Sequence, residues 1–172
     1  MIYITSDWHL NHQRDFVYAA RGFKCVEEMN EALFETYWRT ITPEDTVYFL
    51  GDMIFGTEIE PLARRIASLP GRKLLAFGNH DSDKKIEIYK TANAFDDIQF
   101  GYRIKHNKSY LLLTHRPMLV DNFTHDIVFN IHGHTHSTST VGELPNSFHA
   151  GVDAIGLAPI SLDRIIASLK AP

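Results

Sequence analysis

Residues 46–52 read TVYFLGD, an apolar run typical of a buried β-strand that ends in a glycine and an aspartate. Four other apolar runs, IYITS, KLLAFG, YLLLT and IVFNIHG, are also followed by metal-binding side chains. Polar side chains of this kind are not expected at the ends of buried apolar strands unless the loops at one sheet edge converge on a common site. The sequence therefore predicts a metal centre near Asp7, His9, Asp52, Asn79, His80, His115, His134 and His136.

Strand-like runs alternate with segments of helical periodicity along the rest of the chain. This order is typical of an α/β fold, and a hairpin signal at residues 105–109 (KHNKS) indicates mixed rather than wholly parallel sheets. Strands are expected at residues 2–5, 46–50, 73–77, 98–104, 110–114, 127–131 and 148–152. Helices are expected at residues 26–39, 58–69, 84–90 and 161–170.

The predicted helix at residues 26–39 has one apolar face. Its apolar side chains recur at helical spacing, and they are Met29, Leu33, Phe34, Tyr37 and Trp38. Glutamates occupy the opposite face, so we expect an amphipathic helix that packs on a sheet.

Length and charge limit the classes of protein that fit. With 172 residues, the chain is expected to form a single domain over residues 1–172, without an added cap domain. Its net charge of −4 argues against binding along a nucleic-acid backbone, but a nucleotide or a nucleic-acid end stays open as substrate.

The N-terminal sequence and the hydropathy predict a cytoplasmic protein. Cys25 is the only cysteine, which excludes an intrachain disulfide and a thiolate zinc cluster. The first residues read as a strand rather than a signal peptide, and no apolar run is long enough for a membrane span. Nothing in the sequence predicts an oligomeric state.

The ligand types indicate which metals the site would take. Imidazole nitrogens with carboxylate or amide oxygens form a borderline-hard set that suits Mn²⁺, Fe, Zn²⁺ or Ni²⁺. We expect Mn²⁺, with Mg²⁺ as a further candidate. Two metals about 3.5–4 Å apart need a bridging carboxylate and can clamp a phosphoryl group during in-line attack.

The motif order DWH, GD, GNHD, TH and GHTH, from Asp7 to His136, resembles that of the calcineurin-like metallophosphoesterase superfamily. Every element of the superfamily pattern is present, and the chain is most similar to its compact bacterial and phage phosphoesterases. The resemblance implies a four-layer αββα sandwich, in which two mixed β-sheets pack face to face between helices. It also implies hydrolysis of phosphate esters.

The resemblance assigns a role to each predicted site residue. The ligands of a first metal would be Asp7, His9 and His136. The ligands of a second would be Asn79, His115 and His134, with Asp52 bridging both. A hydroxide bridging the metals would be the nucleophile. His80 would be the general acid that protonates the leaving oxygen, and Asn79 would also reach the phosphate.

Residues beside the motifs are candidates for substrate contacts. His12 could line the pocket or be a polar loop residue, and Arg116 could clamp phosphate oxygens or hold its own loop. Asp81 is expected to cap the following helix rather than to orient His80.

Selectivity is expected to come from the loops at residues 11–16, 53–58 and 118–126. In these loops Met53, Phe55 and Phe123 could form an apolar wall for a base or an aryl group, although packing explains them as well.

The chain departs from the protein Ser/Thr phosphatases of this superfamily. Those carry a longer G-D-x-V-D-R-G segment, whereas residues 51–56 here are GDMIFG. The missing Asp and Arg remove a partner for the general-acid His and a phosphate clamp, so a phosphoprotein substrate is not expected.

The predicted activity is hydrolysis of a small phosphate ester or nucleotide. A phosphodiester is slightly favoured, because a general acid helps most with a poor leaving group. The alternatives are a phosphomonoesterase or nucleotide pyrophosphohydrolase with the same metals. The alternative outside the enzymes is a non-catalytic interaction module. An example is the retromer subunit that keeps this fold but has lost key catalytic residues.

Overall fold

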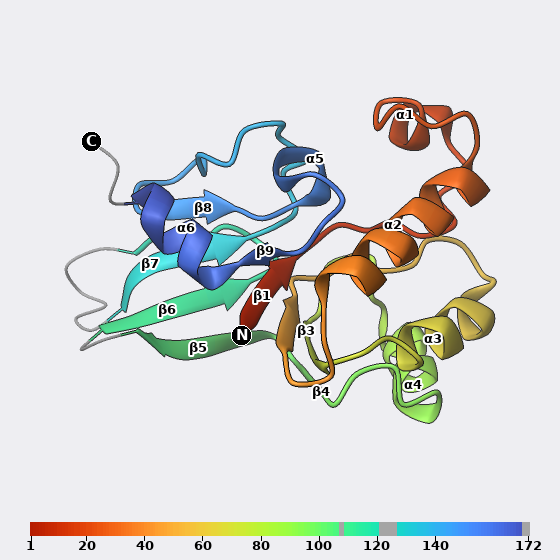
Figure 1. Cartoon of the computed structure of the whole chain (residues 1–172), viewed down its shortest axis with the longest axis horizontal. Coiled ribbons are helices and arrows are strands. Elements are labelled where there is room, and N and C mark those ends of the chain that lie inside the picture. Colours follow the sequence, from red (N-terminus) through yellow and green to blue (C-terminus); the bar gives the residue numbers. More distant parts are fainter. Residues whose placement is uncertain (107–108, 121–126, 170–172) are drawn as a thin grey trace.

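The computed structural model describes residues 1–106, 109–120 and 127–169, which form two β-sheets with helices around them (Figure 1). The first sheet has the strand order β4-β3-β2-β1-β9. Its strands are β1 (Ile2–Thr5), β2 (Thr46–Phe49), β3 (Arg72–Ala76), β4 (Asp97–Gln99) and β9 (Ile160–Ser161). The second sheet consists, in order, of β5 (Gly101–His106), β6 (Ser109–Thr114), β7 (Ile127–His132) and β8 (Ser147–His149).

Both sheets are mixed. In the five-stranded sheet β1 to β4 run parallel, and β9 pairs antiparallel with β1. In the four-stranded sheet β5 and β6 are antiparallel, whereas β6, β7 and β8 are parallel. The prediction of an α/β sandwich of two mixed sheets with flanking helices is therefore confirmed.

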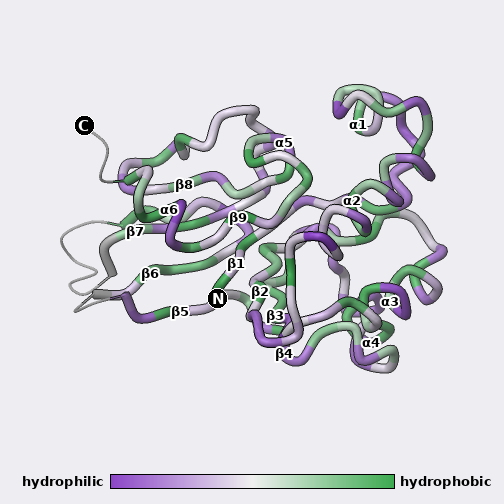
Figure 2. The backbone as a smooth tube through the Cα atoms, in the orientation of Figure 1, coloured by the Kyte–Doolittle hydropathy of each residue, from purple (hydrophilic) through white to green (hydrophobic). Residues whose placement is uncertain are grey.

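The longer helices cover the five-stranded sheet. Apolar and polar residues alternate along α2 (Val26–Thr40), α3 (Ile59–Ala67) and α4 (Asp83–Thr91) (Figure 2). The buried apolar residues of these helices belong to the same core cluster as Tyr3, Phe49 and Leu75 of the sheet. The remaining helices are α1 (Asp15–Tyr18), α5 (Val152–Ile155) and α6 (Leu162–Leu169). Among the described residues, no helix has the length and apolar character that a membrane span requires.

Alternate side chains of the five-stranded sheet enter two separate cores. On one face, Tyr3 and Phe49 pack against the helices. On the other face, Ile4 packs with Leu113 and Ile131 of the four-stranded sheet. Burial on both faces explains why these strands are almost continuously apolar in the sequence.

The structure corrects several predicted boundaries. The single strand expected at residues 98–104 is two strands, β4 and β5, that belong to different sheets and are separated by the exposed Phe100. The last expected strand stops at His149, and Val152 begins α5 instead. The turn of the predicted hairpin includes residues 107–108, which lie outside the described residues.

Trp8 anchors the loop that follows β1. Its side chain is fully buried and makes edge-on contacts with the rings of Phe34, Tyr37 and Phe49 at centroid distances of 5.4–5.8 Å. Its indole Nε1 donates a hydrogen bond of 2.9 Å to Thr5 Oγ1. Because Trp8 lies between Asp7 and His9 in the sequence, this packing holds both of those residues in place.

We predict that Trp8→Ala lowers the free energy of unfolding by about 3–5 kcal/mol, because it leaves a large cavity in the core. The matched control is Trp38→Ala. Trp38 was expected on the apolar face of α2, but its side chain is 55% exposed, so its removal should cost about 0.5 kcal/mol or less. Urea unfolding of the metal-free proteins, followed by circular dichroism, measures both. Equal losses for the two variants would contradict this role of Trp8.

Candidate metal centre

The parallel strands β1 and β2 place two of the motifs side by side. Their register continues beyond the strand ends, where the backbone N–H of Asp7 donates to Gly51 O at 3.1 Å. The N–H of His9 likewise donates to Asp52 O at 3.0 Å. The two loops therefore leave the sheet as a hydrogen-bonded pair, and the Asp7 and Asp52 carboxylates lie at the same edge.

Glycines allow the loops to approach this closely. Gly51 has φ of 93°, and a Cβ at this position would lie 2.7 Å from His115 Nδ1. A Cβ at Gly133 would collide with the side chains of Ser6 and Asp7. The G-D and G-H-T-H motifs thus require glycine on steric grounds.

Five of the predicted metal ligands have left-handed backbone conformations, with φ between 48° and 73°. They are Asp7, His9, Asp52, His134 and His136. Non-glycine residues rarely adopt this conformation, which costs on the order of 1–3 kcal/mol each and is concentrated at functional sites. The cost indicates that the function of the site depends on the directions in which these side chains point.

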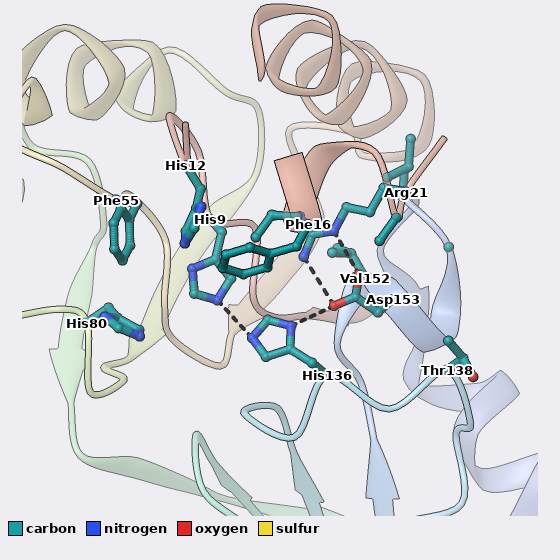
Figure 3. Close-up of a pocket in the computed structure, with 14 residues that line it drawn as sticks. His9, His12, Phe16, Arg21, Phe55, His80, His136, Thr138, Val152 and Asp153 are labelled. Atoms are coloured by element: carbon teal, nitrogen blue, oxygen red, sulfur yellow. Dashed lines mark hydrogen bonds and ion pairs between the residues drawn. The ribbon is translucent and has the colours of Figure 1, made fainter. Parts of the chain in front are cut away.

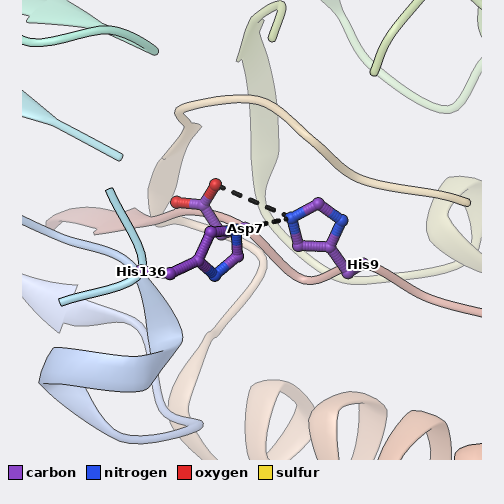
Figure 4. Close-up of side chains that lie close together, drawn as sticks. All are labelled: Asp7, His9 and His136. Atoms are coloured by element: carbon purple, nitrogen blue, oxygen red, sulfur yellow. Dashed lines mark hydrogen bonds and ion pairs between the residues drawn. The ribbon is translucent and has the colours of Figure 1, made fainter. Parts of the chain in front are cut away.

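The first cluster consists of Asp7, His9 and His136, whose possible ligand atoms lie within 4.8 Å of one another (Figure 4). The His9 and His136 Nε2 atoms are 3.1 Å apart. His9 Nε2 also lies 4.0 Å from Asp7 Oδ1. These three side chains come from the loops after β1 and β7, so the cluster joins the two sheets.

The second cluster consists of Asp52, His115 and His134, which also lie within 4.8 Å by their ligand atoms. His134 Nδ1 is 3.2 Å from His115 Nε2. Asn79 joins the cluster, because its Oδ1 lies 2.9 Å from His115 Nε2. The structure thus brings together all four residues predicted around the second metal.

Asp52 lies between the two clusters. Its Oδ2 is 3.7 Å from His9 Nε2 in the first cluster and 3.5 Å from His115 Nε2 in the second. Its Oδ1 accepts a hydrogen bond of 2.8 Å from the backbone N–H of His80, which fixes the carboxylate plane. One carboxylate is therefore within reach of two groups of nitrogen ligands.

The neutral imidazoles of His9 and His115 are suited to binding divalent metal ions. Burial lowers the pKa of His9 to about 2 and that of His115 to about 4, so both imidazoles are neutral, as metal ligands must be. Burial raises the pKa of the Asp7 carboxyl, so its charged form needs a nearby positive charge in the folded chain. A cation held by these nitrogen and oxygen atoms would supply that charge.

Hydrogen bonds behind the clusters set the ring orientations. His115 Nδ1 donates a hydrogen bond of 2.7 Å to Leu50 O. In the neutral ring Nε2 is therefore unprotonated, and its lone pair can bind a metal. His136 Nδ1 is bonded at 2.8 Å to Asp153 Oδ2. Asp153 is held in turn by Arg21, whose guanidinium makes bonds of 2.7 and 3.2 Å to the carboxylate.

Sequence reasoning missed Arg21 and Asp153. Arg21 also donates to the carbonyl oxygens of Asp7 and Trp8, so it ties the first motif to α5. The bonds from His136 and Arg21, and the positive charge of Arg21, lower the pKa of the Asp153 carboxyl, although its burial acts in the opposite direction. No local pattern marks either residue, because their contacts join segments 132 residues apart.

The expected capping role of Asp81 is wrong. Ser82 is the N-cap of α4, and the Asp81 carboxylate is buried beneath the metal-binding loops instead. It accepts hydrogen bonds of 2.8, 3.2 and 2.9 Å from the backbone N–H groups of Asp52, Met53 and Gly78. Asp81 therefore ties the G-D loop to the G-N-H-D loop.

His80, His12 and Arg116 surround the clusters. His80 and His12 line a pocket of about 720 Å³ that also contacts His9 and His136 (Figure 3). The exposed Arg116 lies beside the second cluster, where its Nη1 is 2.9 Å from His134 Nε2 and its Nη2 donates to Asn79 Oδ1 at 3.4 Å.

The expected apolar wall is only partly present. Phe55 lines the pocket, whereas Met53 is buried in the core beneath the helices. Phe123 lies outside the described residues.

We predict that Asp81→Asn lowers the free energy of unfolding by about 1–3 kcal/mol for each backbone N–H that loses its acceptor, because the amide NH₂ group cannot accept a hydrogen bond. The matched control is Asp83→Asn on the exposed first turn of α4, for which we expect less than about 1 kcal/mol. Urea unfolding of both metal-free variants measures the difference. Similar losses in the two would show that Asp81 does not tie the loops together.

Comparison with known proteins places this geometry in a family. The family model for calcineurin-like phosphoesterases matches residues 1–146. An uncharacterized protein of Methanocaldococcus jannaschii is 32% identical over 176 residues, which cover 96% of this chain and 89% of that protein. The gene 66 protein of Mycobacterium phage L5 is 29% identical over 191 residues, which cover 95% and 91%.

A solved structure is similar over almost the whole chain. The crystal structure of a protein of unknown function from Aquifex aeolicus has a TM-score of 0.74 and 28% identity, with 98% of each chain covered. The family match includes both clusters of candidate metal ligands. The chain therefore belongs to the calcineurin-like phosphoesterase family.

Proposed function

We propose that this protein is a phosphoesterase with two divalent metal ions, and that phosphodiesters are its slightly preferred substrates. The observation that carries the proposal is the position of Asp52, whose Oδ2 lies within 3.7 Å of nitrogen atoms in both clusters. A bridging carboxylate between two groups of imidazoles is the arrangement that a pair of metals needs. Family membership supports the same class of reaction.

In this proposal each predicted ligand keeps the role expected from the sequence. Asp7, His9 and His136 hold one metal, Asn79, His115 and His134 hold the other, and Asp52 contacts both. Mn²⁺ is the proposed metal, with Fe, Zn²⁺, Ni²⁺ and Mg²⁺ as alternatives. When bound, the two cations neutralise charge on the phosphate and activate the attacking water.

His80 is the proposed general acid. Its side chain is 43% exposed toward the pocket, and its Nε2 lies 3.9 Å from Asp52 Oδ2. His80 therefore lies beside the proposed metals without belonging to either ligand cluster. A protonated imidazole at this place donates its proton to the oxygen of the departing alcohol.

Arg116 and Asn79 are the proposed contacts to the phosphate oxygens. Arg116 Nη1 approaches His134 Nε2, which can accept this bond only when Nδ1 carries the ring proton. If Nδ1 gives its electron pair to a metal, Nε2 carries the proton and no longer accepts from Arg116. The guanidinium is then available for a phosphate oxygen. His12 is proposed to contact the substrate through the pocket wall.

The proposal also covers the domain organisation, the substrate and the location of the protein. Residues 1–172 are proposed to act as a single domain, with no cap domain among them. The substrate is a small phosphate ester or a nucleotide, with a nucleic-acid end as a further candidate, and the proposed location is the cytoplasm. A phosphomonoesterase or nucleotide pyrophosphohydrolase with the same metals is the alternative enzyme. A non-catalytic interaction module is the alternative outside the enzymes.

We predict that the metal-free protein binds two Mn²⁺ ions in isothermal titration calorimetry. His136→Ala and His115→Ala should each remove one binding event, because they belong to different clusters. Asp52→Asn should weaken both. Each occupied site should stabilise the fold by about 2.7 kcal/mol when the free metal concentration is 100 times its dissociation constant.

The control for metal binding is His106→Ala. His106 pairs with Ser109 at one end of the β5–β6 hairpin, whereas Thr114, which precedes His115, pairs with Gly101 at the other end. It should leave both binding events unchanged. A single binding event in the wild type, or loss of both events in His136→Ala alone, would contradict the two-cluster assignment.

We predict Mn²⁺-dependent hydrolysis of bis-p-nitrophenyl phosphate, and a decrease in kcat of about 10²–10⁴-fold in His80→Ala for diesters with poor leaving groups. The decrease should be smaller for p-nitrophenolate than for phenolate, because p-nitrophenolate leaves without help from an acid. Steady-state assays with the two leaving groups measure this difference, with His106→Ala as the control.

Three results would change the proposal. An equal loss for both leaving groups would remove His80 as the acid. Faster turnover of p-nitrophenyl phosphate than of the diester would favour the monoesterase. A protein that binds two metals but hydrolyses neither ester would favour the interaction module.

A further inference from the structure

The pocket beside the proposed metals extends well beyond the phosphate site. Its volume is about 720 Å³, within the range typical of sites for small molecules and larger than a phosphate group needs. Its walls come from α1 with the turn that follows it, and from α5 with the residues after it (Figure 3). The part of the substrate that is not phosphate therefore has a defined place to bind.

One wall of this pocket is aromatic. The rings of His12 and Phe55 lie against each other, with centroids 4.0 Å apart and an interplanar angle of 37°. Phe16 meets the outer edge of His12 at 5.5 Å, and His80 meets Phe55 at 5.3 Å. These four rings extend from the proposed general acid to the rim of the pocket, and we call His12, Phe16 and Phe55 the aromatic wall.

Core packing does not account for the outermost ring. Phe16 lies on α1, a four-residue helix without buried residues, and its side chain is 69% exposed. It nevertheless lines the pocket beside His9 and His136 (Figure 3). An exposed phenylalanine at the rim of a pocket gains burial only when a ligand covers it.

We propose that the aromatic wall binds the nucleobase of a small nucleotide ester, while its phosphate lies at the metal centre. This inference rests on the proposed function, because it places the phosphate between the two ligand clusters. A nucleobase is flat and has a π-face, so it can stack on Phe16 or on the His12–Phe55 pair. The polar side chain of Thr138 also lines the pocket, on the far side from His12 and Phe55 (Figure 3).

The size and charge of the site favour a small nucleotide over a polymer. A pocket of this volume holds one nucleotide or two. The chain has a net charge of −4, whereas proteins that bind along a nucleic-acid backbone carry a basic surface. Recognition of the base by stacking needs no such surface.

The test compares two ligands that differ only in the base. AMP and ribose 5-phosphate share the phosphate and the sugar, and their dissociation constants for the Mn²⁺-loaded protein are measured by isothermal titration calorimetry. If inorganic phosphate is released from either, their methylene phosphonate analogues replace them. We expect AMP to bind about 5- to 150-fold more tightly than ribose 5-phosphate, as stacking of one base provides.

Variants of the aromatic wall test whether stacking causes the preference for AMP. At least one of Phe16→Ala and Phe55→Leu should remove most of the preference for AMP, and both should leave the affinity for ribose 5-phosphate within twofold. The matched control is Phe100→Ala, because Phe100 is also exposed (65%) but does not line the pocket. This variant should bind both ligands like the wild type.

Several outcomes would overturn the inference. They are equal affinity of the wild type for the two ligands, binding of neither ligand, an equal loss for both ligands in Phe16→Ala, and an unchanged preference in both wall variants. Because binding is measured without turnover, a preference for AMP in a protein that hydrolyses no ester would support the pocket and refute the proposed function. Hydrolysis of bis-p-nitrophenyl phosphate without a preference for AMP would support the proposed function and refute the base site.

Discussion

The parallel pairing of β1 with β2 is the constraint on which the rest of the site depends. In a parallel pair both strands reach the same sheet edge with the same polarity, so the residues that follow them emerge together. Here the pairing continues into the loops, through bonds from the backbone N–H groups of Asp7 and His9. Without this extension the Asp7 and Asp52 carboxylates would not share one edge, and the imidazoles of the four-stranded sheet would have no common centre to meet.

This arrangement places polar side chains where the fold would otherwise bury apolar ones. Asp7, His9, Asp52 and His115 are all at most 4% exposed, and burial works against the charged form of Asp7, His9 and His115. The burial of these polar side chains and the left-handed conformations of several of them both cost free energy in the folded chain. A bound cation relieves the electrostatic part, so metal binding and folding stability are expected to be coupled.

The walls of the pocket come largely from α1, α5 and the residues that follow them, at the edge of the core to which Val152 belongs. α1 has no buried residues, and α5 supplies Asp153, which holds His136 on one side and meets Arg21 on the other. The Arg21–Asp153 pair thus connects the segment after α1 to the first cluster. The position of Phe16 over the pocket depends on the same connection, so the proposed base site and the proposed metal site share their supporting contacts.

The sequence by itself determined which residues form the two candidate metal clusters and most of the α/β order, because each candidate ligand follows a strand closely and strand periodicity is a local property. The tertiary structure alone decided the contacts that hold the centre together. Asp81 binds the backbone of Asp52 rather than the helix that follows it, and Asp153 meets Arg21 across 132 residues of sequence. It also decided that residues 98–104 serve two sheets. Such features depend on which surfaces pack together, and a pattern within one segment carries no information about its distant partner.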